Sequence, residues 1–245
     1  MTLNYIILGI LQGIFEWIPV SSEGVVAVAG NFLIADINAV DLALFLHLGT
    51  IFSALYYFRK DWKDVFLFQN KELFKFLTIT TAVSLPIGFF VYQFARTMGV
   101  GAGLLILTGF GLLITAFFHK KKIKFNLTND KSAVFAGVMQ AFAAIPGFSR
   151  SASTVFALSF SQHSPQKILK LSYMMSVPVV FASSFYLYLQ NPAKLYDGWS
   201  ALLASFVVGL LSLKALMGLS QKLNAFWFAI IFSALCFLGA AFILL

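Results

Sequence analysis

Residues 9–24 read Gly9-Ile-Leu-Gln12-Gly-Ile-Phe-Glu16-Trp-Ile-Pro19-Val-Ser21-Ser22-Glu23-Gly24, and residues 137–151 read Gly137-Val-Met-Gln140-Ala-Phe-Ala-Ala-Ile-Pro146-Gly147-Phe-Ser149-Arg150-Ser151. Each stretch runs Gly-x-x-Gln, then apolar residues, then a proline and a serine-rich polar cluster. The first cluster carries carboxylates and the second carries a guanidinium. Two related segments with these charges predict one composite pocket for an anionic substrate.

The composition indicates a polytopic membrane protein. Of the 245 residues, 60% are hydrophobic and 11% are charged, and the mean hydropathy is +0.89. A soluble domain of this size could not bury so much apolar surface. The one cysteine, Cys236, excludes an intramolecular disulfide, and no cleaved signal peptide is expected. Because basic residues collect in cytoplasmic loops, the net charge of +8 does not predict nucleic-acid binding.

Hydropathy predicts six full membrane spans. They lie at about 41–58, 73–95, 99–118, 168–190, 200–218 and 225–245, each near the roughly 20 residues that cross a bilayer. Pro86 and Pro178 fall inside two of these spans and should kink them by removing a backbone hydrogen bond.

Residues 4–34 and 132–162 differ from these spans, because each is a pair of short apolar runs around a polar centre. Polar backbone is costly in lipid unless protein encloses it or it lines a cavity. Two re-entrant helical hairpins fit best, and the alternative is an ordinary kinked span in each place. The fold class is therefore an all-α polytopic membrane protein with six transmembrane helices and two re-entrant hairpins.

The predicted architecture is a single membrane domain, 1–245, built from two repeats, 1–118 and 132–245. Three crossings per repeat put the second copy in the opposite orientation, and such inverted repeats place their sites near the midplane. The loops of one side then hold every Lys and Arg except Arg96, Arg150 and Lys194. That asymmetry assigns this side to the cytoplasm and both termini to the outside of the plasma membrane.

Glu16 is the first polar oddity, because a carboxylate at membrane depth is usually paired or functional. Gln12 lies four residues earlier on the same helical face. The alternative is a glutamate near the outer interface that reaches water. At Ser21 and Ser22, a helix N-cap and an anion site are equally compatible with the residue types. A nearby carboxylate would make one of these serines an activated nucleophile.

The second cluster is the sharper signal for an anion. Gly147 permits an unusual backbone turn, and hydroxyls surround Arg150, whose planar fork matches phosphate geometry. The alternative is a purely structural ion pair between Arg150 and Glu16. His47 is six residues into its span, about 9 Å deep, which the first hairpin could share. It would be either a catalytic imidazole or a histidine bonded to a neighbouring helix.

The segments Glu16-Trp-Ile-Pro-Val-Ser21-Ser22 and Pro146-Gly-Phe-Ser149-Arg150-Ser151 together resemble the undecaprenyl-diphosphate phosphatase family, the bacitracin-resistance type of membrane lipid diphosphatase. The resemblance covers essentially the whole chain. It implies an enzyme that recycles the lipid carrier of cell-wall synthesis. It also implies the six spans, two hairpins and inverted repeat that hydropathy and charge predict.

By this resemblance, Glu16 is the second acid of the family's Glu-x-x-x-Glu motif, Ser22 is its nucleophile and Arg150 binds the diphosphate. The remaining substrate-binding candidates are Gln12, Ser21, Gln140, Gly147, Ser149, Ser151 and Thr154. The family implies a divalent cation, Mg²⁺ or Ca²⁺, as cofactor, with Glu16 as its candidate ligand.

Two positions depart from the family pattern. The first Glu of the motif is Gln12 here, and the family's Ser-Ser-Thr-Gly-His is Ser21-Ser22-Glu23-Gly24-Val25, so the family's histidine is missing. We hypothesise that Glu23 keeps a carboxylate close to the serines. We also hypothesise that His47 supplies an imidazole from a neighbouring helix.

The predicted reaction converts a polyprenyl diphosphate to its monophosphate and inorganic phosphate. Ser22, or a water activated by Glu16, would attack the terminal phosphorus. The alternative is a flippase or transporter for a polyprenyl phosphate, since inverted repeats with midplane sites are typical of transporters. Expected partners are the lipid substrate and membrane lipids, with a homodimer as a further option.

Overall fold

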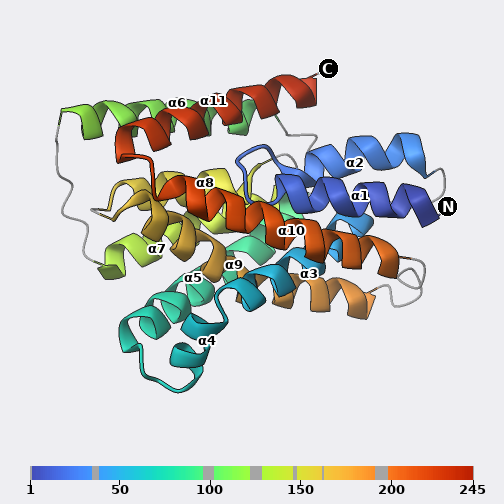
Figure 1. The fold of residues 1–245 in the computed structure, drawn as a ribbon, viewed down its shortest axis with the longest axis horizontal. Coiled ribbons are helices and arrows are strands. Elements are labelled where there is room, and N and C mark those ends of the chain that lie inside the picture. The colour runs from blue at the N-terminus through green and yellow to red at the C-terminus, as the bar shows by residue number, and fades with distance from the viewer. Residues whose placement is uncertain are drawn as a thin grey trace.

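The computed structural model describes residues 2–34, 39–95, 102–121, 129–145, 148–161, 163–190 and 198–244. The elements of this part of the chain are all helical (Figure 1). The first half contains α1 (Thr2–Phe15), α2 (Ser22–Leu33), α3 (Ala39–Tyr57), α4 (Arg59–Phe66), α5 (Lys71–Ala95) and α6 (Ala102–Lys120). The second half contains α7 (Asn129–Ala141), η1 (Phe142–Ala144), α8 (Arg150–Ser159), α9 (Pro165–Gln190), α10 (Trp199–Ser220) and α11 (Ala225–Leu244).

Four helices of the described chain are long and apolar enough to cross a membrane, at Lys71–Gln93, Pro165–Tyr186, Trp199–Ser220 and Ala225–Phe242. They correspond to four of the six predicted spans. The other two, 41–58 and 99–118, coincide with α3 and α6, whose apolar parts Phe45–Tyr57 and Ile106–Phe117 are shorter. Pro86 and Pro178 lie inside α5 and α9, and both helices continue past them. The protein is a multi-pass membrane protein.

Hydropathy did not predict α4, a helix of eight residues between α3 and α5. Its sequence, Arg-Lys-Asp-Trp-Lys-Asp-Val-Phe, is strongly amphipathic, and it buries Trp62 and Val65 against its neighbours. A short helix that is mostly charged has no signal in a search for apolar runs. Lys170 of α9 donates to Asp61 of α4 at 2.5 Å and links these two helices.

The helices of the two halves pack on each other through glycines. A Cβ added at Gly9 of α1 would meet the Ala201 carbonyl oxygen of α10 at 2.1 Å. A Cβ added at the equivalent glycine of the second motif, Gly137 of α7, would lie 3.0 Å from the Thr80 carbonyl oxygen of α5. Small residues let membrane helices approach so closely. The glycine that opens each Gly-x-x-Gln motif therefore seats a short helix of one half on a long helix of the other.

The two predicted hairpin segments each hold two short helices, α1 with α2 and α7 with α8. In Figure 1, α1 and α2 lie towards the end of the bundle that carries the marked N-terminus, and α7 lies towards the opposite end. α1 packs on α10 and α2, whereas α7 packs on α5 and α8. The breaks that follow α1 and precede α8 meet beside α3 and α9 in the interior, and this meeting point contains the candidate site.

Candidate active site

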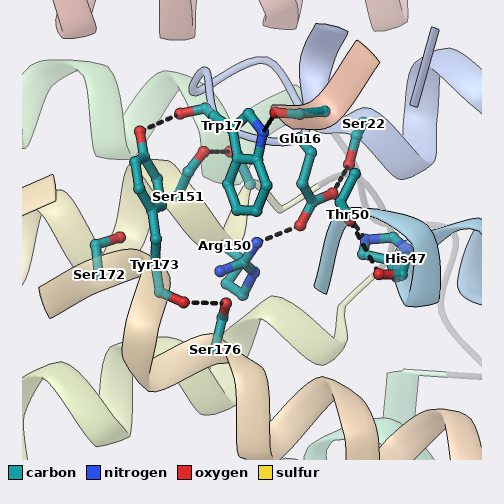
Figure 2. Close-up of polar contacts among 12 residues, drawn as sticks. Glu16, Trp17, Ser22, His47, Thr50, Arg150, Ser151, Ser172, Tyr173 and Ser176 are labelled. Atoms are coloured by element: carbon teal, nitrogen blue, oxygen red, sulfur yellow. Dashed lines mark hydrogen bonds and ion pairs between the residues drawn. The ribbon is translucent and has the colours of Figure 1, made fainter. Parts of the chain in front are cut away.

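Glu16 is the centre of the cluster. It follows the last residue of α1, and its backbone N–H still donates to the Gln12 carbonyl at 3.0 Å. Its side chain is only 3% exposed. One carboxylate oxygen, Oε2, accepts from Gln12 Nε2 at 2.7 Å and from Ser22 Oγ at 2.8 Å, and His47 Nε2 lies 3.2 Å away (Figure 2). Three residues predicted to share this pocket with Glu16 therefore contact the same oxygen atom.

Arg150 contacts the other carboxylate oxygen. Its Nη2 pairs with Glu16 Oε1, and its side chain is 12% exposed. Nη1 of the same guanidinium is buried and has no hydrogen-bond partner among the described residues. A buried donor without an acceptor costs about 1–3 kcal/mol, and a charged donor costs more. Glu16 therefore satisfies Nη2 of the guanidinium, whereas Nη1 is a buried donor with no acceptor among the described residues.

The local backbone explains why these side chains project from helix ends. Pro19 lies in the non-helical segment between α1 and α2. Ser21, two residues later, adopts φ 55°, a left-handed conformation that is rare for a non-glycine residue. Ser21 caps α2 by accepting from Gly24 N at 3.4 Å. Ser149 caps α8 in the same way, accepting from Ala152 N at 3.3 Å. Of the two serines predicted to be either a cap or an anion ligand, Ser21 is the cap and Ser22 is the first residue of its helix. The Ser149 cap, which was not predicted, places Arg150 first in α8 in the same way.

Ser149 and Ser151 form a short chain of hydrogen bonds to the segment that follows α1. Ser151 Oγ donates to the Ile18 carbonyl at 2.9 Å, and it lies 3.1 Å from Ser149 Oγ. A hydroxyl has a single proton, so Ser149 must be the donor between the two serines. Both hydroxyls were expected to face a phosphate; here Ser149 donates to Ser151, and the Ser151 proton joins the polar breaks of the two halves.

The remaining predicted residues lie at different distances from the centre. Thr154 Oγ1 bonds to the Arg150 carbonyl at 2.8 Å. Gln140 does not join the Glu16 cluster: its Nε2 donates to Ser84 Oγ at 3.1 Å and to the Met175 carbonyl at 3.3 Å. Gly147 lies outside the described residues, as does the side chain of Glu23.

Sequence reasoning missed three residues beside the centre. Trp17 is 1% exposed and donates from Nε1 to the Gly209 carbonyl at 2.8 Å. Tyr173 of α9 donates to the Trp17 carbonyl at 2.7 Å, and Ser172 bonds to Thr154 at 2.6 Å. Trp17 stands within the first motif, directly after Glu16, but its residue type does not indicate a role. The Ser172-Tyr173 pair is one of several hydroxyl-bearing positions in its span, so the pair by itself does not indicate a site.

The donor set does not fit a divalent cation held by protein ligands alone. Both oxygens of Glu16 already face N–H or O–H donors, and Arg150 puts a positive charge beside them. Among the side chains that the structure describes, no three His, Cys, Asp or Glu residues gather as ligands of one metal ion.

Fold and site together define a helical membrane protein with a buried arginine, carboxylate and hydroxyl cluster between its halves. The chain belongs to the family described as bacitracin resistance protein BacA, whose sequence profile matches residues 5–238. This match confirms the family resemblance of the two motifs.

Three relatives show the same relationship, and each is named undecaprenyl-diphosphatase. The protein from Haloarcula marismortui is 33% identical over 246 residues, covering 91% of this chain and 90% of the relative. Those from Methanococcoides burtonii and Syntrophotalea carbinolica are 31% and 32% identical, and each alignment covers more than nine-tenths of both chains.

Proposed function

We propose that this protein is a membrane lipid diphosphatase that converts undecaprenyl diphosphate, or a similar polyprenyl diphosphate, to the monophosphate. The name shared by the relatives supports this reaction and does not favour the flippase alternative. The observation that carries it is the buried pair of Arg150 and Glu16, in which Nη1 of Arg150 has no acceptor among the described residues. A non-bridging oxygen of a diphosphate is the acceptor that suits this donor.

Binding would place the terminal phosphoryl group between Arg150 and Ser22. Arg150 Nη1 would take a phosphate oxygen while Nη2 stays on Glu16, so the guanidinium would be held in place before the substrate arrives. Such preorganisation is the main way in which a charged donor lowers the barrier of phosphoryl transfer. The polyprenyl tail would remain in the lipid.

Ser22 is the proposed nucleophile because its hydroxyl already donates to Glu16 at 2.8 Å. In the first step Ser22 Oγ bonds to the terminal phosphorus, the proton moves to Glu16, and the bridging oxygen leaves with the polyprenyl monophosphate. In the second step water attacks the phosphoserine phosphorus, the bond between Ser22 Oγ and phosphorus breaks, Glu16 returns its proton to Ser22 Oγ, and inorganic phosphate leaves with the water oxygen and its protons. A water activated by Glu16 would give the same products in one step, with Ser22 as a ligand.

His47 is the proposed source of the imidazole that Val25 does not provide. Its Nε2 lies 3.2 Å from the carboxylate oxygen that would receive the serine proton. It could orient Glu16, or accept that proton and return it to the leaving group. Glu23, which follows Ser22 directly in the sequence, is the second candidate to replace the family's missing histidine.

A Mg²⁺ or Ca²⁺ requirement is also a proposal. Since the described side chains do not form a metal site, we propose that a required cation is bound by the diphosphate itself and enters the site with the substrate. A chelator should then lower turnover without changing the thermal midpoint of the substrate-free protein.

We further propose six membrane spans and two re-entrant hairpins in an inverted repeat. The helices α1, α2, α7 and α8 have 14, 12, 13 and 10 residues. At 1.5 Å per residue the longest is about 21 Å, short of the roughly 30 Å hydrocarbon core. The exchange of partners, α1 on α10 and α7 on α5, supports two equivalent halves.

The same proposal puts both termini outside the cell. In Figure 1 the C-terminus lies at the top and the N-terminus at the right, whereas α4, which carries Arg59, Lys60 and Lys63, lies at the bottom of the bundle. Single-cysteine labelling in intact cells at residues 2 and 60 tests this orientation. A homodimer remains part of the proposal, and the mass of the protein in nanodiscs tests it.

The decisive assay uses purified protein, undecaprenyl diphosphate and detected phosphate. We expect phosphate release by the wild type, and none by Ser22→Ala or Arg150→Ala. Lys75→Ala is a matched control, because Lys75 is an exposed cation paired with Asp130 far from the cluster in sequence. Full activity of Arg150→Ala would refute the proposal, and wild-type lipid binding without release would favour transport.

A further inference from the structure

Two adjacent residues of α9, Ser172 and Tyr173, contact both polar breaks of the site. Tyr173 reaches the segment that carries Glu16, and Ser172 reaches the helix that begins with Arg150. Both residues are fully buried. The proposed mechanism uses neither of them.

We call the hydrogen bonds of Tyr173 and Ser172 to the two polar breaks the tyrosine arm and the serine arm. The tyrosine arm satisfies a backbone carbonyl that is left free where α1 ends. α1 ends before Trp17, and the Tyr173 hydroxyl donates to the Trp17 carbonyl at 2.7 Å. The two rings also meet edge to face, with centroids 5.0 Å apart. The indole N–H of Trp17 is tied to Gly209 of α10. The residue directly after Glu16 is therefore fixed at its ring, its indole nitrogen and its carbonyl.

The serine arm acts through Thr154, one helical turn after Arg150. Thr154 Oγ1 lies 2.8 Å from the Arg150 carbonyl and 2.6 Å from Ser172 Oγ. Because the threonine hydroxyl has one proton and the carbonyl can only accept, Ser172 must donate to Thr154 and Thr154 to Arg150. Ser172 is thus connected to the backbone of Arg150 through a directed chain of two hydrogen bonds.

The two adjacent residues differ from other polar residues of these helices in the number of segments they connect. Several serines of the chain bond to a carbonyl of their own helix, as Ser176 does with Tyr173, or to one other helix, as Ser205 of α10 does with Leu46 of α3. Ser172 and Tyr173 instead bond to two other segments, one from each half of the chain. Figure 2 shows both side chains on α9, on the side of Arg150 away from His47.

We propose that Ser172 and Tyr173 are positioning residues that set the distance between Glu16 and Arg150. Both arms come from consecutive residues of one continuous helix, so the separation of their ends is fixed by the helix itself. The inference rests on the proposed function. It adds that α9 keeps the Glu16 carboxylate and the Arg150 guanidinium at a constant distance while the charge on the bound phosphate changes during the reaction.

The test compares Tyr173→Phe and Ser172→Ala with the wild type in the phosphate-release assay. Tyr173→Phe keeps the ring contact with Trp17 and removes only the hydroxyl. Because misplacement of a catalytic group by about 1 Å can lower the rate about 100-fold, we expect kcat to fall at least about tenfold. KM should stay within about twofold, since Arg150 remains available for binding.

Three controls separate positioning from general structure. Ser176→Ala removes a hydroxyl of the same helix that bonds to its own backbone, and Tyr56→Phe removes the hydroxyl of an exposed tyrosine. Both should keep the wild-type kcat. Ser172→Thr keeps the hydroxyl and should recover most of the kcat that Ser172→Ala loses.

Wild-type kcat in both Tyr173→Phe and Ser172→Ala would overturn the inference. So would a loss of kcat that Ser172→Thr does not recover, because that pattern indicates packing and not the hydrogen bond. If Tyr173→Phe does not fold, the Ser172 series decides alone. Absence of phosphate release in the wild type would refute the proposed function and not the role of α9.

Discussion

The buried pair of Glu16 and Arg150 gives the sharpest stability prediction. We consider Glu16→Ala, Arg150→Ala and the double variant. Each single change leaves one ionised partner in a site where the side chains are 3% and 12% exposed. Removing one partner of a buried ion pair typically lowers the free energy of unfolding by about 3–5 kcal/mol. Glu16→Ala also leaves the donors of Gln12 and Ser22 without their acceptor.

If the two losses were independent, the double variant would lose about 6–10 kcal/mol. We expect it to lose about 2–3 kcal/mol less than that sum, because it leaves no unpaired charge. The exposed pair of Lys75 and Asp130, whose side chains are 61% and 56% exposed, is the matched comparison. Its coupling should be about 0–1 kcal/mol.

The assay is reversible unfolding by sodium dodecyl sulfate in mixed micelles. Tryptophan fluorescence is a suitable signal because Trp17, one residue from the pair, is 1% exposed. Additivity of the two single variants within about 0.5 kcal/mol would refute the reasoning, since it would mean that neither charge depends on the other. A coupling equal to that of Lys75 and Asp130 would refute it as well.

Three further predictions concern other parts of the molecule. Gly9→Ala should lower the free energy of unfolding by about 1–3 kcal/mol in the same micelle assay, because the new Cβ would meet the Ala201 carbonyl oxygen at 2.1 Å. Gly218→Ala is the control and should not lower this free energy, because a Cβ added at Gly218 would point into open space. Ser22→Ala should bind polyprenyl diphosphate with a Kd close to that of the wild type and release no phosphate, as judged by equilibrium binding and by single-turnover assays. Burial lowers the pKa of His163 below its usual 6.5. The contribution of His163 to stability is therefore complete above pH 6.5 and is lost as the pH falls through the folded-state pKa. When the pH is lowered, the thermal midpoint of His163→Gln should fall less than that of the wild type.

Much of the helix arrangement could be predicted from sequence, because lipid-exposed helices must be long and apolar. The four long membrane helices lie within a few residues of their predicted spans. α4 could not be found in this way, since its charged residues hide an apolar face of only two buried side chains. The family, too, was predictable, because its two motifs are local in sequence.

Part of the site was also predictable. A membrane-buried carboxylate needs partners, and the argument from depth correctly brought His47 within reach of Glu16. The catalytic roles of both residues stay predictions. The hydrogen bonds of Ser151 and Tyr173 were not predictable, because a hydroxyl in an apolar helix can bond to its own turn or to a distant backbone group. Only tertiary packing decides between these choices.

The separation of Glu16 and Arg150 in the chain has a consequence for biosynthesis. The two residues are 134 positions apart. At about 5–20 residues per second, the ribosome needs about 7–27 s to make the second after the first. During this interval α1 also lacks α10, against which its glycine face packs. α1 can therefore complete its contacts only after α10, which begins at Trp199, has been synthesised. The packing of α1 on α10 is a late event of translation.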